Sequence, residues 1–192
     1  RIFYFHVASA WTAFLAFFLV FLGSVAYLRT RDTGWDVLAA SVAEIGVVFT
    51  SLTLLSGSIW ARSAWGTWWT WEPRLTTTLL LWLIYVSYLL LREMVEEPSR
   101  RAAFAAVFGI IAFVDVPIVF MSIRWWRSLH PAVVGGEGFN MEATMLPALF
   151  LSLAAFTTVL AYLLLLRTEL ERCQQGVAEL KEHARWIQEG GD

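Results

Sequence analysis

The feature that most constrains this chain is a succession of long apolar segments separated by short polar ones. An α-helix rises about 1.5 Å per residue, so about 20 residues cross the roughly 30 Å hydrocarbon core of a bilayer. Five segments are long enough, at about residues 8–28, 37–60, 75–91, 102–123 and 143–166. We therefore predict an all-α integral membrane protein, a bundle of five visible transmembrane helices with a C-terminal helix.

The composition supports the same fold class. Of the 192 residues, 58% are hydrophobic and 16% are charged, whereas a soluble domain has about a quarter of its residues charged. A formal net charge of −2 gives no case for nucleic acid binding. The single cysteine, Cys173, excludes an internal disulfide.

The basic residues fall unequally on the two sides of the membrane. One side collects Arg29, Arg31, Arg92, Arg100, Arg101, Arg167, Arg172, Lys181 and Arg185, and the other has Arg1, Arg62, Arg74, Arg124 and Arg127. Since cytoplasmic loops carry the excess of Lys and Arg, the first side is predicted to be cytoplasmic. We expect a membrane domain over 1–166, with outer loops at 61–74 and 124–142, and a cytoplasmic polar helical tail over 167–192.

A cluster of tryptophans occupies the loop before the third apolar segment, in the sequence WGTWWTWEPRLT over 65–76. One interpretation is an interfacial belt, because indole rings favour the membrane–water boundary. The other is a platform for a large, flat, apolar ligand with a charged edge, on which Arg74 pairs with a carboxylate. The tryptophans are Trp65, Trp68, Trp69 and Trp71, and Glu72 follows them.

This loop resembles the tryptophan-rich (WWD-type) signature of the haem-handling membrane proteins of cytochrome c maturation. Within that group the chain is similar, over nearly its whole length, to the haem exporter protein C (CcmC) family. Glu72 stands where the family often has aspartate. The family has six membrane spans with both ends in the cytoplasm, so the resemblance implies that the family's first helix is missing here.

Three histidines are present, His6, His130 and His183. The predicted topology brings His6 and His130 to the outer face beside the tryptophan loop, and the resemblance implies that these two are axial ligands of haem iron. His183, in the polar tail, is predicted to be solvated. A closed zinc site is disfavoured because the outer face has no cysteine and only scattered acids. The candidates for haem propionates are the outer arginines Arg62, Arg74, Arg124 and Arg127, and interfacial snorkelling is the competing interpretation. Arg74 can equally pair with Glu72 and only shape the loop.

Two acids lie inside apolar segments. Intramembrane carboxylates are functional candidates by default, and helix packing is the competing interpretation for both Glu44 and Asp115. The sequence Asp115-Val116-Pro117 also indicates a kink in the fourth segment. Gly135, Gly136 and Gly138 indicate flexibility in the second outer loop.

Together, the residues and the resemblance favour delivery of non-covalent haem b, in transit at the outer face of the bacterial inner membrane, to a periplasmic haem chaperone. The implied partners are ATP-hydrolysing and permease subunits and a small membrane subunit, since this chain has no P-loop. We expect no enzyme activity. The alternatives are a component of a cytochrome c haem lyase or synthase, whose relatives carry intramembrane histidines, and a permease scaffold without a ligand.

Overall fold

The structure, a computed structural model, describes residues 2–135 and 138–188. Within these residues five helical segments are long and apolar enough to cross a membrane, which confirms the prediction of an all-α integral membrane protein. The elements are α1 Ile2–Thr30, α2 Thr33–Trp65, α3 Pro73–Met94, α4 Pro98–Ala112, α5 Asp115–Trp125, β1 Val134–Gly135, β2 Gly138–Phe139, the 3₁₀ turn η1 Ala143–Met145 and α6 Leu146–Gln188.

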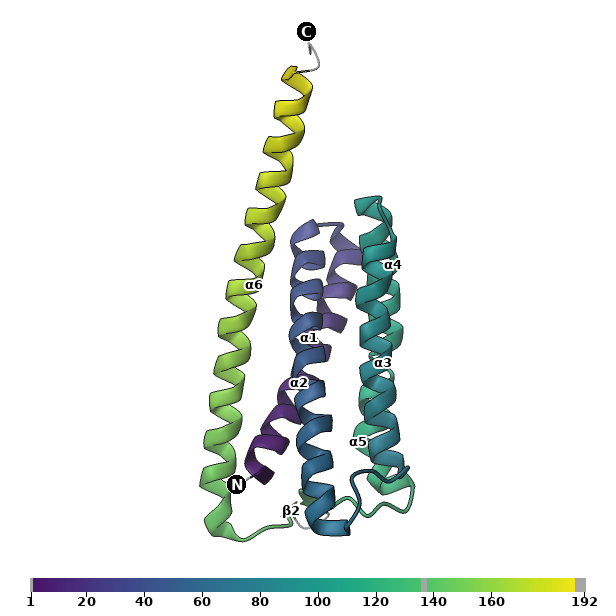
Figure 1. Ribbon diagram of the computed structural model, residues 1–192, viewed down its shortest axis with the longest axis vertical. Helices are drawn as coiled ribbons and strands as arrows, with labels where there is room; N and C mark the ends of the chain where they lie inside the picture. The colour runs from purple at the N-terminus through teal and green to yellow at the C-terminus, as the bar shows by residue number, and fades with distance from the viewer. Residues whose placement is uncertain (1, 136–137, 189–192) are drawn as a thin grey trace.

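The helices α1 to α5 form a bundle, and α6 lies along one side of it (Figure 1). One end of the bundle, here called the loop end, carries the start of α1, the α2–α3 loop and the connection from α5 to α6 (Figure 1). The opposite end, the tail end, carries the α1–α2 turn and the α3–α4 turn, and the second half of α6 projects beyond it (Figure 1). The topology therefore gathers the predicted site residues at the loop end.

A close contact between α1 and α2 holds the centre of the bundle. A Cβ atom at Gly46 of α2 would lie only 2.5 Å from the ring of Phe17 on α1. That ring in turn stacks on Tyr85 of α3, with ring centroids 3.6 Å apart. Because the rings of Phe17 and Tyr85 are buried and closely packed, a side chain at position 46 would not fit. Glycine there allows α1, α2 and α3 to pack together at this level.

The fourth membrane segment, Pro98–Trp125, is one helical span with a local distortion between α4 and α5, at the place where the sequence predicts a kink. The α-helical pattern is interrupted at Phe113 and Val114, between α4 and α5. Pro117 explains the position of the break, because a proline has no N–H and its ring clashes with the carbonyl four residues earlier, which here belongs to Phe113. Asp115 begins α5, is buried, and its Oδ2 has no hydrogen-bond partner among the described residues.

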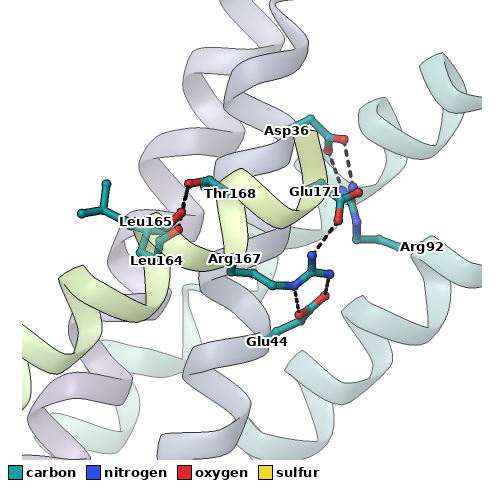
Figure 2. Close-up of polar contacts among 8 residues, drawn as sticks. All are labelled: Asp36, Glu44, Arg92, Leu164, Leu165, Arg167, Thr168 and Glu171. Carbon is teal, nitrogen blue, oxygen red and sulfur yellow. Dashed lines mark hydrogen bonds and ion pairs between the residues drawn. The ribbon is translucent and has the colours of Figure 1, made fainter. Parts of the chain in front are cut away.

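Ion pairs join the helices toward the tail end (Figure 2). Arg92 of α3 forms two hydrogen bonds to Asp36 of α2, at 2.6 and 2.9 Å. Arg167 of α6 is likewise bidentate to Glu44 of α2, at 2.6 and 2.8 Å, and also contacts Glu171 at 2.8 Å. These contacts support the helix-packing interpretation of Glu44.

The helix α6 continues through residue 167 without interruption. The division into a membrane domain over 1–166 and a tail over 167–192 therefore has no break in secondary structure, and it remains a prediction from composition. Residues 189–192 of the tail lie outside the described residues.

Candidate functional site

Two histidines that are far apart in the sequence meet at the loop end. His6 lies in the first two turns of α1, and His130 lies in the connection that follows α5. Their ring centroids are 6.2 Å apart and their planes are inclined by 38°. The helix topology thus places two imidazoles side by side, as the sequence predicted.

Hydrogen bonds fix which nitrogen of each imidazole carries the proton. Ser56 donates its only hydroxyl proton to the Leu52 carbonyl at 2.6 Å, so its oxygen accepts the bond from His6 Nδ1 at 3.0 Å. His130 Nδ1 lies 3.0 Å from the carbonyl oxygen of Pro131, which can only accept. Both rings are therefore protonated at Nδ1, and both keep a free lone pair at Nε2, the arrangement that orients a histidine ligand for a metal.

The spacing of the two rings corresponds to one metal atom between them. A metal–imidazole bond is about 2 Å long and the ring centre lies roughly 1 Å further, so rings on opposite sides of one metal have centres about 6 Å apart. The measured 6.2 Å agrees with this value. A pair of histidines supplies two ligands, which suits a metal whose remaining ligands come from a flat macrocycle.

A cleft opens beside the two histidines, and both imidazoles are among its lining residues. Its walls come from α1, α2, the α2–α3 loop and the start of α3. Three indole rings line it, those of Trp60, Trp65 and Trp69. The Trp60 ring packs against both the Trp65 ring, at 5.2 Å, and the His130 ring, at 6.4 Å.

The electrostatics of the cleft favour a neutral imidazole and an anionic ligand edge. Among the described residues that line the cleft, Arg74 is the one that carries a fixed charge. Burial, helped by the nearby Arg74 charge, lowers the pKa of His130 to about 4, so the ring is uncharged at neutral pH and able to bind a metal. The guanidinium of Arg74 suits a carboxylate on the ligand.

The carboxylate of Glu72 connects the tryptophan loop to residues 126–133, which follow α5 and carry His130, here called the histidine loop. Its Oε2 accepts hydrogen bonds from the Ser128 hydroxyl at 2.6 Å and from the Leu129 N–H at 2.7 Å. Ser128 Oγ in turn accepts a bond from the His130 N–H at 3.1 Å. Glu72 is buried, so these contacts are shielded from water, and they position His130 relative to the tryptophans.

Comparison with known proteins decides the family. Residues 1–186 match the family described as Heme exporter protein C. This chain belongs to that family. A relative of that name from Bradyrhizobium diazoefficiens is 37% identical over 176 residues, which cover 90% of this chain and 67% of the relative. The relative from Escherichia coli K12 is 29% identical over 194 residues, covering 98% and 75%.

A further relative, from Marchantia polymorpha, is named a putative cytochrome c biosynthesis ccmC-like mitochondrial protein. It is 33% identical over 169 residues, which cover 88% of this chain and 72% of the relative. The predicted resemblance to this family is thereby confirmed, and the similarity extends over nearly the whole chain.

Not every predicted site residue of this family member lines the cleft. Trp65, Trp69 and Arg74 do, and the Trp69 Nε1 is buried with no hydrogen-bond partner among the described residues. By contrast, Trp68 and Trp71 are 59% and 76% exposed and are not among the lining residues.

The arginines of the loop end have different surroundings. Arg127 is exposed and does not line the cleft. Arg62 donates to the Gly66 carbonyl and lies over the Trp68 ring at 5.9 Å, so it shapes the turn that leaves α2. Arg74 faces the cleft instead, and its Nη1 reaches the Val119 carbonyl of α5 at 3.5 Å.

Sequence reasoning missed three residues on one face of α2. Ser56 orients His6, Trp60 packs on His130, and Gly57 makes room for the His6 ring, whose Cε1 would lie 3.0 Å from a Cβ atom there. Trp60 follows Ser56 by four residues and Gly57 by three, which places it on the same side of the helix as both. That spacing was available from the sequence, but nothing in it indicated that this side faces His6.

We predict that Glu72→Ala loosens the histidine loop without unfolding the bundle. Removing an ionised acceptor of two hydrogen bonds should weaken local closure by about 2 kcal/mol, which corresponds to about thirtyfold faster hydrogen exchange at the Leu129 amide. Exchange measured by mass spectrometry on the protein in detergent tests this. Glu142→Ala, which removes an exposed acid of the same connection, should leave exchange at Leu129 unchanged, and equal protection in both variants would contradict the assignment.

Proposed function

We propose that this protein binds haem in the cleft at the loop end, with His6 and His130 as axial ligands, and passes it to a periplasmic haem chaperone. The observation that carries the proposal is the pair of imidazoles 6.2 Å apart, each with Nδ1 engaged as a donor. Two such nitrogens on opposite sides of one iron give a low-spin site in which the porphyrin supplies the other four ligands.

The remaining contacts of the cleft fit the other parts of a haem. The rings of Trp65 and Trp69 offer flat apolar area for the porphyrin, and Arg74 offers a fork of N–H donors for a propionate. Trp71, Trp68 and the exposed Arg127 lie outside this wall.

Transfer requires that the haem be held without a covalent bond. The single cysteine of the sequence, Cys173, lies on the projecting part of α6 and is remote from the loop end, so a thioether link to haem b in the cleft is not available. The relatives carry the names heme exporter and cytochrome c biosynthesis protein, which supports a carrier in cytochrome c maturation rather than an enzyme. ATP hydrolysis and permease function then belong to partner chains, and a small membrane subunit is a further partner.

We predict that protein purified from haem-replete cells has the absorption spectrum of low-spin haem with two histidine ligands. His6→Ala and His130→Ala should each lose most of the bound haem or shift it to a high-spin spectrum, because one axial bond is removed. His183→Ala is the matched control, since that ring is exposed on α6 and stacks on Trp186. A high-spin spectrum in the unmodified protein would refute the two-histidine site.

We also predict that neighbouring tryptophans of one loop differ in their effect on haem binding. Trp69→Ala should weaken haem affinity about fivefold or more, because a stacked ring contributes about 1 kcal/mol beyond the buried area, whereas Trp68→Ala should change it little. Titration of the haem-free protein with haem measures both. Trp69→Phe should restore most of the affinity if ring contact is the cause, and failure of phenylalanine to do so would assign the effect to the indole N–H.

The proposal requires that the loop end face the outside of the bacterial inner membrane. In a Cys173→Ser background, Ser63→Cys should react with a membrane-impermeant thiol reagent added to intact cells. Ser99→Cys, at the tail end, should react only after the cells are opened. Both serines are exposed in the structure, so accessibility to reagent is matched, and the reverse pattern would place the cleft on the wrong side for delivery to a periplasmic chaperone.

A further inference from the structure

The second half of α6 is a long helix without a covering partner in the described chain. The whole of α6 has 43 residues, which at about 1.5 Å per residue span about 65 Å, roughly twice the hydrocarbon core of a bilayer. Its apolar stretch ends at Arg167, about 30 Å from its first residue. The part beyond Arg167 projects away from the bundle in the same direction (Figure 1).

This projecting part carries a repeat that a solitary helix does not need. Residues Leu163, Leu166, Leu170, Cys173, Val177, Leu180, Ala184 and Ile187 follow one another at alternating intervals of three and four. An apolar spacing that averages 3.5 residues is the heptad pattern of a coiled coil, with these side chains at the a and d positions of the seam. The large side chains of the seam beyond the bundle are exposed, Leu180 by 71%.

Beyond Leu170 the large side chains of the seam are exposed, whereas its first three positions, Leu163, Leu166 and Leu170, line a groove with Glu44, Ile45 and Val48 of α2. The bundle face is marked by Leu160 and Leu164, which pack against the core, and by Arg167, which pairs with Glu44. Counting 100° per residue, the seam residues are centred roughly a quarter of a turn or more from that face. A partner helix on the seam would therefore lie beside α2 at its first positions, while Leu160, Leu164 and Arg167 keep α6 attached to the bundle.

We propose that residues 163–187 of α6 form a parallel, two-stranded coiled coil with the same segment of a second copy of this chain. Two copies inserted in one membrane with the same orientation project their α6 helices from the same face. They are then parallel, and the membrane surface sets them in register. Six of the eight repeat positions lie beyond Arg167, where α6 projects from the bundle, so pairing there needs no rearrangement of the bundle.

The side chains at and beside the seam favour a self-complementary pair. Among the four a positions of the seam, Val177 is the β-branched one, and Leu180 follows it at d, the combination that favours two strands. In the parallel register the flanking g and e positions bring Glu169 to Gln174, and His183 to Gln188 of the second copy. No like charges oppose each other in these pairs, so the helix does not repel its own copy.

A membrane surface is a poorer occupant of the same face. An interfacial helix lies in the plane of the membrane with its apolar side in the headgroup region. The second half of α6, however, continues the direction of the membrane-crossing half without a bend (Figure 1), and α6 is unbroken from Leu146 to Gln188. The seam residues therefore lie on a helix that projects away from the membrane, and not on a helix that rests on the bilayer surface.

The native cysteine makes the proposal directly testable in the full chain in its membrane. Cys173 occupies a d position, so in a parallel, in-register pair it faces Cys173 of the second copy. Treatment of membranes with copper–phenanthroline, an added oxidant, should convert the chain to a disulfide-linked dimer seen on a non-reducing gel. In a Cys173→Ser background, Leu180→Cys at the next d position should give the dimer, and Ala178→Cys, on the outward side, should give several-fold less.

A variant that disrupts the seam distinguishes cross-linking within a specific coiled coil from cross-linking by random collision. With Cys173 present, Leu180→Asp should reduce the linked dimer several-fold, because it places two facing charges in the seam, and Ala178→Asp adds the same charge on the outward side and should not. The fold of each variant is checked by its melting temperature in detergent, which should be unchanged since neither residue contacts the bundle.

Three results would overturn the proposal. Equal linkage at the seam and outward positions would indicate collision only. Cross-links from Cys173 to a protein of another mass, without the self-dimer, would assign the seam to a different helix. Protection of Cys173 and Leu180→Cys by added lipid vesicles, with no dimer, would assign it to a membrane surface. The readout does not depend on haem, so it is independent of the proposed function.

Discussion

The constraint on which this structure depends is that a bilayer core offers no water to backbone N–H and C=O groups. Each membrane-crossing segment must then satisfy its own hydrogen bonds, and a helix is the way a single segment does so. Apart from the distortion between α4 and α5, irregular backbone among the described residues consequently lies at the ends of the bundle. The site uses this confinement, because the tryptophan loop and the histidine loop are irregular segments held together at one end while the helices beneath them supply the floor.

At the loop end, side chains satisfy the hydrogen-bonding groups of the loops, which regular secondary structure does elsewhere in the molecule. Glu72 stands at the N-terminus of α3 but does not cap it with its side chain. It instead accepts hydrogen bonds from Ser128 and Leu129, groups of a loop that has no helix to satisfy them. Ser56 acts similarly for His6, by giving its proton to its own helix and leaving its oxygen to orient the ring. Both histidines are thus positioned through a second residue.

The sequence was sufficient for the membrane segments and for the meeting of the two histidines, because hydropathy and topology are properties of whole segments. It was insufficient inside the loops. Trp68 and Trp69 are adjacent in the sequence, yet one is exposed and the other lines the cleft, and an irregular loop has no period from which this can be read. The role of Glu72 was equally hidden, since its partner Ser128 lies 56 positions further along the chain. The distortion between α4 and α5 was predictable from Pro117, because a proline lacks the N–H that would bond to the carbonyl of Phe113.

The two ends of the bundle differ in the free energy that is needed to separate their contacts. At the tail end the Asp36–Arg92 pair is largely buried, and separating it would leave a charge in apolar surroundings, at a cost of about 3–5 kcal/mol. At the loop end the histidine loop is held by two hydrogen bonds to the Glu72 carboxylate. The later part of the same connection contacts α6 through the ring of Phe139, which packs edge-on against Phe150. The groups that donate to that carboxylate lie in an irregular loop, so they can pass to water as the loop lifts away, whereas the ion pair joins two helices and can be separated only by moving those helices apart. Motion that admits or releases a flat ligand is therefore cheapest at the connection that carries His130, and the helices beneath can stay fixed while the ligand is exchanged.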